Sequence, residues 1–146
     1  MKFNVDRSRS IITAMIHGRK VTAMDVAWLR REVFAGGQVT RDTADELFEV
    51  ERAGIAKSAE WTDLFVEMIT EHVVWEARPT GVLSDAQAEW LIQRADGCAS
   101  INALALLVNV LGEAQRAPRW FLAAVRARAT KGWSGVAEAL SLAAAG

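Results

Sequence analysis

Metal-ligating and proton-transferring side chains concentrate in residues 59–77. Glu67 and Glu71 are four residues apart there, and so are His72 and Glu76. Residues four apart on a helix lie one turn from each other, so each pair could bring two side chains to one metal ion or polar ligand. This stretch is therefore the first candidate for a functional site.

The helical register of this stretch separates its histidine from its carboxylates. Aromatic and apolar residues recur at spacings of 4, 3, 4 and 3 and define one stripe: Trp61, Phe65, Met68, His72 and Trp75. Carboxylates define another: Glu60, Asp63, Glu67 and Glu71. We expect His72 to face the core and the carboxylates to face solvent. No metal or cofactor is therefore expected, and a site formed by Glu71, His72 and Asp96 is the alternative.

Charge is distributed unevenly along the chain. Residues 42–76 hold 10 acidic and 2 basic side chains, a net charge of −8, whereas residues 1–41 are net +5 and residues 77–146 are net +2. This pattern favours salt-sensitive association with a basic surface, either of another protein or of a second copy of this chain. The alternative is that the acids are the solvated faces of amphipathic helices.

Candidate partner-binding residues follow from the charge pattern. The acidic candidates are Glu46, Glu49 and Glu67. Exposed ion pairs contribute little, about 0–1 kcal/mol each, so a specific contact also needs an apolar anchor. Trp120 and Trp133 have the most polar neighbourhoods among the tryptophans, and they are the candidates for that anchor.

Several function classes are disfavoured by composition. The single cysteine, Cys98, cannot form an internal disulfide and has no histidine at a motif spacing, so neither an oxidising compartment nor a catalytic thiol is expected. The longest uncharged run, Gly97–Gly112, is shorter than the about 20 residues that a membrane span needs. Nucleic-acid binding through a helix–turn–helix is disfavoured, because its second helix would be acidic in residues 41–54 and without positive charge in residues 100–113. We expect a cytoplasmic protein that is not an enzyme.

Helix-forming residues dominate and proline is sparse, so an all-α fold is predicted. One domain over residues 1–146 is expected. Helices 59–77 and 100–113 should be central, because the second is apolar on nearly every side, whereas helix 41–54 should lie on the surface. The seven to eight predicted helices span about 8–17, 22–35, 41–54, 59–77, 84–95, 100–113, 117–130 and 133–144.

Residues 22–53 and 84–114 form an internal repeat. Each copy passes through a helix-capping residue, a Trp-Leu pair, a glycine and a second hydroxyl residue: Thr22, Trp28, Gly37 and Thr40 in the first, and Ser84, Trp90, Gly97 and Ser100 in the second. The pattern predicts two helix–loop–helix units related by a pseudo-twofold axis, each unit starting at a capping box.

The loops of the two units carry a family resemblance. Ala35–Thr40 reads Ala-Gly-Gly-Gln-Val-Thr, and Ala95–Ser100 reads Ala-Asp-Gly-Cys-Ala-Ser. Both resemble the Asp-Gly-x-(small apolar)-Ser/Thr loops of the TerB-like (tellurite-resistance protein B) family, over about residues 20–130. The resemblance implies an all-helical domain built around two helix–loop–helix units, and a role in the response to chemical stress.

Two departures from the family pattern remove acidic groups. Gly36 stands where the family favours Asp, and Thr43 and Ala103 stand where it favours Glu. We therefore expect a non-enzymatic TerB-like protein that acts by binding a partner, without a metal-linked role. The alternative function is a metal- or small-ligand-binding helical domain that uses His72 and the acids of helix 59–77.

Overall fold

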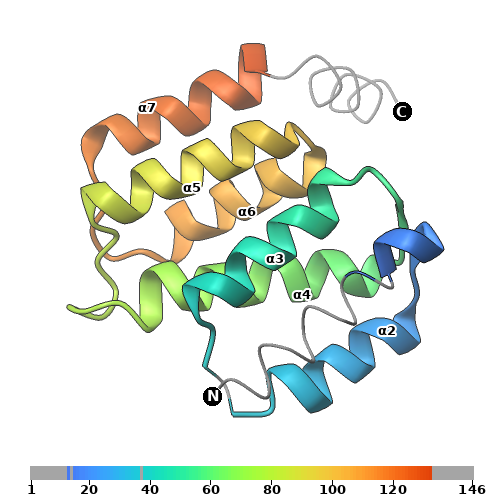
Figure 1. Ribbon diagram of the computed structural model, residues 1–146. Helices are drawn as coiled ribbons and strands as arrows, with labels where there is room; N and C mark the ends of the chain where they lie inside the picture. Colours follow the sequence, from blue (N-terminus) through green and yellow to red (C-terminus); the bar gives the residue numbers. More distant parts are fainter. Residues whose placement is uncertain (1–12, 14, 37, 133–146) are drawn as a thin grey trace.

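Helices pack around one central helix in the computed structural model (Figure 1). The structure describes residues 13, 15–36 and 38–132, so the helix predicted at 133–144 and most of the one at 8–17 lie outside the described residues. The predicted all-α class is confirmed, since the described β-structure is limited to two very short strands and one bridge. The helical elements are α2 (Ala23–Trp28), η1 (Leu29–Val33), α3 (Arg41–Arg52), α4 (Ala59–Thr70), η2 (Glu71–Trp75), α5 (Asp85–Cys98), α6 (Ile101–Glu113), α7 (Arg119–Ala127) and η3 (Arg128–Gly132), and the strands are β1 (Lys20–Val21) and β2 (Ala56–Lys57).

Helix α4 lies at the centre, as its apolar stripe predicts. Helices α2, α3 and α6 pack against it, and α6 in turn packs against α5 and α7. Burying each large apolar side chain stabilises the fold by about 1.5–3 kcal/mol, so this shared core is the main source of stability. The largest fully buried side chains include Leu29, Leu47, Trp61, Phe65, Ile69, Leu91, Leu107 and Phe121.

Hydroxyl side chains begin the helices, as the sequence predicts, but the capping box expected at Ser84 is half formed, because the Gln87 side chain accepts from Arg41 at 2.6 Å and not from the Ser84 backbone. Thr22 and Asp25 form a reciprocal capping box, with the Asp25 N–H donating to Thr22 Oγ1 at 3.2 Å and the Thr22 N–H donating to Asp25 Oδ2 at 2.9 Å. Thr40, Ser84 and Ser100 each accept from the backbone N–H three residues later, at 3.1 Å. These bonds satisfy donors that the first helical turn leaves unpaired. Ser58 stands at the start of α4, but its buried hydroxyl has no hydrogen-bond partner among the described residues.

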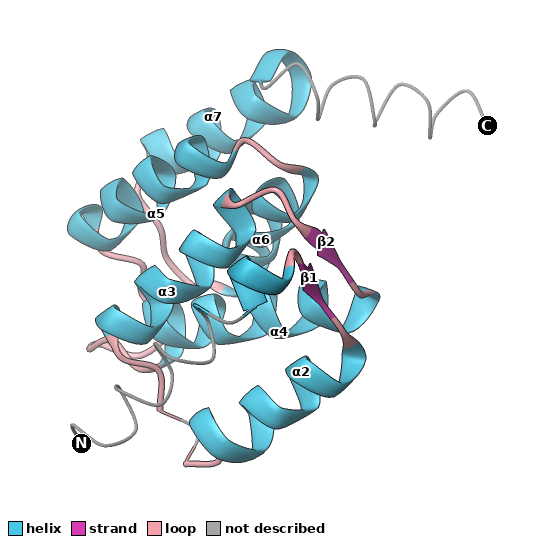
Figure 2. Ribbon diagram, turned by 45° about the vertical axis from the view of Figure 1, so that its right-hand side comes forward, coloured by secondary structure: helices cyan, strands magenta, loops and turns pink. Residues whose placement is uncertain are grey.

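Short parallel pairings close both helical hairpins. Strand β1, just before α2, pairs with β2, just after α3, in the register Lys20 with Ala56 (Figure 2). In the second copy, Val82 bridges Arg116 in parallel, and the Leu83 N–H donates to the Arg116 carbonyl at 2.9 Å. The sequence does not predict these pairings, because two residues are too few to show an alternating apolar pattern.

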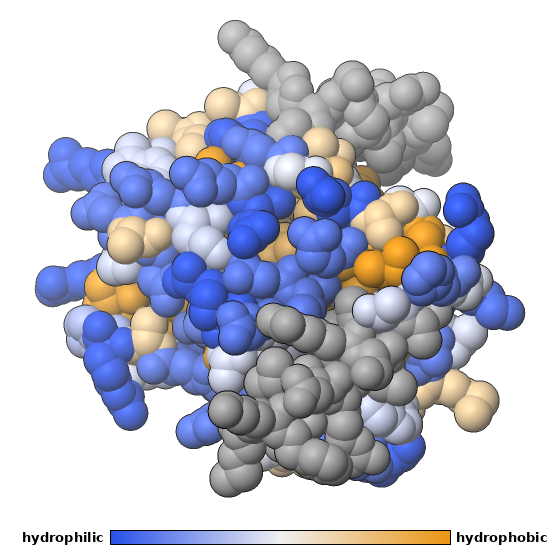
Figure 3. Space-filling model, viewed as in Figure 1, coloured by the Kyte–Doolittle hydropathy of each residue, from blue (hydrophilic) through white to orange (hydrophobic). Residues whose placement is uncertain are grey.

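Helices α3 and α6 differ less in burial than the sequence predicts. Helix α3 buries Leu47, Phe48 and Val50, so only its acidic face lies on the surface. Helix α6 is central, but its uncharged side toward solvent leaves Ile101 and Val108 exposed. Hydrophilic residues predominate on the molecular face shown in Figure 3, as expected where amphipathic helices turn their polar sides outward.

The second interhelical loop is shorter than predicted. The sequence places Asp96, Gly97 and Cys98 in a loop, whereas α5 continues through all three. The helix ends because Ala99 adopts a left-handed conformation, with φ of 47°. A non-glycine residue in this position is costly, so the sequence favours Gly97 as the stop signal and misplaces the helix end by a few residues.

Candidate binding groove

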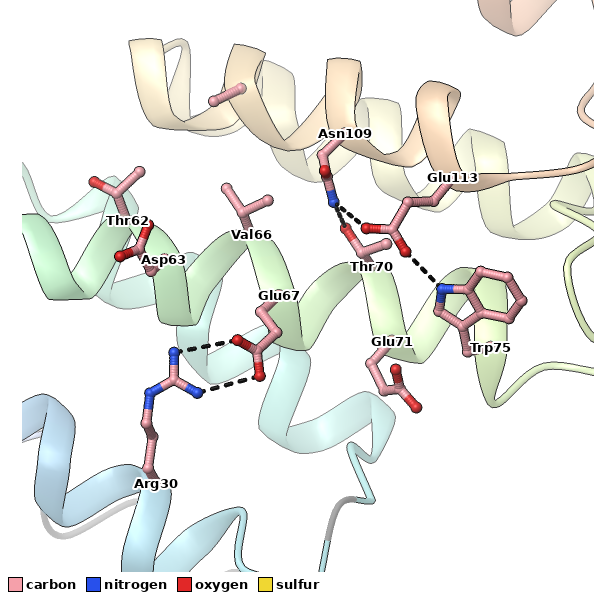
Figure 4. A pocket seen from close by; sticks show the side chains of 11 residues that line it. Arg30, Thr62, Asp63, Val66, Glu67, Thr70, Glu71, Trp75, Asn109 and Glu113 are labelled. Atoms are coloured by element: carbon pink, nitrogen blue, oxygen red, sulfur yellow. Dashed lines mark hydrogen bonds and ion pairs between the residues drawn. The ribbon is translucent and has the colours of Figure 1, made fainter.

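An open groove of about 680 Å³ runs between α4 and α6 (Figure 4). Its floor and walls come from these two helices and η2, and Arg30 of η1 reaches it from a third side. The lining residues are Arg30, Thr62, Asp63, Val66, Glu67, Thr70, Glu71, Trp75, Ala105, Asn109 and Glu113. Four carboxylates therefore face one arginine, which gives the groove a net charge of −3.

The acidic wall of the groove consists of three of the four residues in the carboxylate stripe predicted from the sequence; the fourth, Glu60, borders a smaller hollow. Asp63, Glu67 and Glu71 recur at spacings of four along α4 and η2, opposite the face that buries Trp61 and Phe65. Asp63 and Glu71 have no ion-pair partner among the described residues. Like charges at this spacing repel one another, so a cation in the groove would relieve that repulsion.

Arg30 of η1 forms an ion pair with this acidic wall. Its two terminal nitrogens donate to the two carboxylate oxygens of Glu67 at 3.1 and 3.3 Å. Both side chains are solvent-accessible, at 39% for Arg30 and 58% for Glu67. Arg30 also borders two smaller hollows, of about 270 and 240 Å³, which continue along α4 past Phe34 and Glu60 respectively. The guanidinium thus lies where three hollows meet.

A hydrogen-bond network fixes the opposite end of the groove (Figure 4). The Trp75 indole donates to Glu113 Oε1 at 2.7 Å, and the Asn109 amide donates to Glu113 Oε2 at 3.0 Å. The same amide donates to Thr70 Oγ1 at 2.9 Å. Both oxygens of Glu113 are held, so this carboxylate presents a fixed negative charge to the groove.

Trp75 lies in the groove because the helix changes its pitch after α4. The sequence predicts Trp75 on the buried stripe of a regular helix. Residues 71–75 instead form the π-helical turn η2, closed by the Glu76 N–H donating to the Glu71 carbonyl at 2.8 Å. Its i→i+5 bonds shift the following side chains around the axis, so Val73 and Val74 are buried and Trp75 is only half-buried.

His72 faces the loop before α3 and not the groove. Its Nδ1 lies 2.8 Å from the Val39 carbonyl, and the Arg41 Nε donates to its Nε2 at 3.3 Å. An arginine can only donate, so Nε2 is the acceptor and the proton is on Nδ1, which donates to Val39. Burial lowers the pKa of His72 below its ordinary value, and the nearby Arg41 lowers it further, against the Val39 hydrogen bond. The predicted hydrogen-bonded histidine is found, half-buried against the Trp90 ring.

Glu76 holds the other side of the same peptide segment. Its two carboxylate oxygens accept from the Val39 N–H at 2.8 and 3.0 Å. Burial raises the pKa of Glu76 above its ordinary value, which the Val39 hydrogen bonds partly offset. Glu76 and His72 thus bind the N–H and the C=O of the same buried residue, Val39.

The three weak metal candidates are not brought together. Glu71 lines the groove, whereas both ring nitrogens of His72 are engaged elsewhere. Asp96 lies on α5 and accepts from Arg128 at 2.7 and 2.8 Å. Within the described ranges, no group of three or more His, Cys, Asp or Glu side chains has a geometry that could hold a metal ion.

The partner-binding candidates lie on separate surfaces. Glu67 lines the groove, while Glu46 and Glu49 are on α3 and Glu49 pairs with Arg52 at 3.9 Å. Trp120, 38% exposed, donates to Asp85 Oδ1 at 2.8 Å at the α5–α7 side of the molecule. Trp133 lies outside the described residues. Among the partner-binding candidates that the structure describes, Glu67 is thus the one that lines the groove.

Cys98 makes no candidate nucleophile. It is half-buried at the end of α5, where its thiol donates to the Phe48 carbonyl at 3.6 Å. Burial, with smaller contributions from Glu51 and Glu49, raises the pKa of Cys98 to about 12. The reactive thiolate is therefore scarce at neutral pH.

No family model, curated protein or solved structure matches this chain. Membership of the TerB-like family stays a prediction from the two loop sequences. Among the described residues, no helix is long and apolar enough to cross a membrane. Functional inference therefore starts from the groove.

Proposed function

We propose that this chain is a non-enzymatic binding protein whose groove receives a basic segment of a protein partner. The observation that carries this function is that four carboxylates, Asp63, Glu67, Glu71 and Glu113, line one groove together with one basic residue, Arg30. Lysine and arginine side chains are the cationic groups that a partner protein offers, and arginine binds carboxylates with two parallel hydrogen bonds. The stress-response role and the cytoplasmic location belong to the same proposal.

Arg30 serves as an internal substitute for the guest cation. It already makes with Glu67 the two-pronged contact that an incoming arginine would make. The exposed pair is worth about 0–1 kcal/mol, so a guest can displace Arg30 at small cost. Displacement would join the groove to the two smaller hollows along α4 and lengthen the binding surface.

The groove geometry favours a partner segment over the metal-binding alternative. A metal site using His72 needs a free ring nitrogen, and both nitrogens are hydrogen-bonded to Val39 and Arg41. Three of the groove acids are spread along the α4 and η2 wall, the fourth, Glu113, lies on α6, and the four do not converge on a point. An elongated row of carboxylates suits an elongated guest with several positive charges.

Fluorescence anisotropy with a labelled arginine-rich helical peptide of unrelated sequence tests this function. Neutralising the wall with Asp63→Asn, Glu67→Gln and Glu71→Gln should weaken peptide binding by on the order of tenfold. The matched control, Asp42→Asn, Glu49→Gln and Glu89→Gln, removes the same charge from exposed sites on α3 and α5 and should change binding little.

Arg30→Ala gives the sharper result, because it should tighten peptide binding a few-fold by freeing Glu67. A peptide of the same length with acids in place of arginines should not bind. Equal weakening by the groove and control triples would show that net charge alone attracts the peptide, and the groove function would be wrong.

A further inference from the structure

The outward face of α7 is basic. Arg119 and Arg126 are exposed, while Phe121 and Val125 bury the opposite side of the helix. No hydrogen bond or ion pair is assigned to either arginine side chain within the described part of the chain. Leu122, exposed at 39%, lies between them. Helix α7 therefore presents two free guanidinium groups and one large apolar side chain.

An apolar strip on α6 borders the groove. Ile101, Ala105, Val108 and Gly112 recur at spacings of 4, 3 and 4, and all four are exposed. Ala105 also lines the groove, so the strip continues its α6 wall. Val108 is 53% exposed, which is high for a valine on a central helix of the core. The groove thus has an acidic wall on α4 and an apolar rim on α6.

The spacing of these groups matches between the two surfaces. Arg119 and Arg126 are seven residues apart on α7, as Glu60 and Glu67 are on α4. Seven residues on a helix span about 10.5 Å, so two arginines of α7 can each meet one acid of α4. Ile101 and Val108 have the same spacing on α6, and a helix lying along the groove can place Leu122 between them.

We infer that the basic segment received by the groove is helix α7 of a second copy of this chain. This inference rests on the function proposed above and names its partner. Within one molecule α7 packs against α6 and buries Phe121 and Val125, on the opposite side of the molecule from α2, whose neighbouring Arg30 borders the groove (Figure 1). The two surfaces therefore meet between molecules, in a head-to-tail contact that uses different patches on the two copies.

Charge-reversal variants provide the test by sedimentation. The full chain should self-associate with rising concentration, and added salt should weaken the association because its charges are exposed. One variant, Arg119→Glu with Arg126→Glu, keeps the groove and loses the basic helix. The other, Glu60→Arg with Glu67→Arg, keeps the basic helix and reverses the charge of two α4 acids, Glu67 in the groove and Glu60 in the smaller hollow beside it. Each alone should associate at least on the order of tenfold more weakly than the parent chain.

Mixing the two variants should restore association, since each supplies the surface that the other lacks. Circular dichroism of each variant alone should match the parent, which separates lost contact from lost fold. Leu122→Gln should weaken association of the parent chain at high salt as well, where only the apolar contact is left.

Two outcomes overturn the inference. A monomeric parent chain at all concentrations, with arginine-peptide binding intact, would leave the groove function standing and remove α7 as its guest. If neither variant weakens self-association, or if mixing the variants fails to restore it, the contact between copies lies on another surface of the molecule. Failure of both peptide binding and self-association would remove the groove function together with its partner.

Discussion

The loop of the first hairpin, residues 34–40, and the turn of the second, around Ala99, are held by different kinds of contact. The second is local: the Ala99 N–H donates to the Ala95 carbonyl at 2.8 Å and Ser100 begins the next helix. The first depends on tertiary contacts, because His72 and Glu76 bind the backbone of its residue Val39. The two hairpins thus have matching helix caps and the same topology, but long-range contacts hold the loop of the first and local contacts hold the turn of the second.

This difference links the first hairpin to the rest of the molecule. The residues that hold its loop belong to η2, which also places Trp75 and Glu71 in the groove. Arg30, on η1 just before that loop, borders the groove from the other side. The second hairpin supplies α6 as a fixed wall. Movement of the first hairpin would therefore change the shape of the groove, whereas the second hairpin supplies a wall that stays in place.

The largest expected effect tests whether the two hairpins share one core. Leu107→Ala in α6 and Leu47→Ala in α3 each remove a fully buried side chain, so each should lower the free energy of unfolding by about 2–5 kcal/mol. Chemical denaturation measures both. A small effect of Leu47→Ala alone would restore the sequence-based expectation that α3 is peripheral.

The next effect concerns the long-range hold on the first loop. Glu76→Ala leaves the buried Val39 N–H without its acceptor and should cost about 1–3 kcal/mol. Hydrogen exchange should become faster at the Val39 amide and stay unchanged at the Ala99 amide. Glu89→Ala, at an exposed site on α5, is the control and should change neither.

A smaller effect, of opposite sign, tests the local turn. Ala99→Gly relieves the left-handed strain of Ala99 at some cost in unfolded-chain entropy, so the protein should gain about 0.5–1 kcal/mol. Ala123→Gly, at an ordinary helical position on α7, should instead lose up to about 1 kcal/mol. Equal destabilisation by both changes would mean that the turn at Ala99 carries no strain.

The smallest effect is a pH dependence that arises where His72 of η2 contacts the loop of the first hairpin. Because the pKa of folded His72 lies below its ordinary value of 6.5, the unfolded chain takes up this proton first as pH falls. The stability contributed by neutral His72 is therefore present above that value and is lost as pH falls toward the folded-state pKa. Melting temperatures between about pH 7.5 and about pH 5.5 should fall more for the parent chain than for His72→Gln.

His17→Gln provides the matched control, since His17 is an exposed histidine. Glu76 has the opposite sign: its folded-state pKa is raised, so acidification toward its ordinary value of 4.5 favours the fold. Comparing each histidine variant with the parent at the same pH cancels that contribution. Identical pH dependence in parent and His72→Gln would contradict the role assigned to His72.

Local signals in the sequence predict much of the fold. Thr22, Thr40, Ser84 and Ser100 mark helix starts because a hydroxyl and a backbone N–H three residues away satisfy each other within one turn. The carboxylate stripe of α4 is visible for the same reason, since a fixed periodicity places its members on one face. These features involve residues close together in the chain.

The rest of the groove depends on packing between distant segments. Glu113 joins Trp75 across 38 residues of sequence, and Arg30 joins Glu67 across 37. No local pattern marks such pairs. The position of Trp75 was also unpredictable, because a π-turn is not encoded by apolar spacing. Exposure of Val108 is likewise decided by which neighbours α6 acquires and not by its own composition.

The pairing of β1 with β2 brings together the two ends of the first hairpin, and the pairing of Val82 with Arg116 brings together the two ends of the second. A segment that begins and ends at the same place can be copied, inserted or transplanted with little disturbance of the chain on either side. The equivalent residues are offset by 62 positions before the loop, as in Lys20 and Val82, and by 60 after it, as in Ala56 and Arg116. Because the two ends of each unit lie together, tandem duplication of one unit requires little change in the rest of the fold. Helix α4 connects the two units.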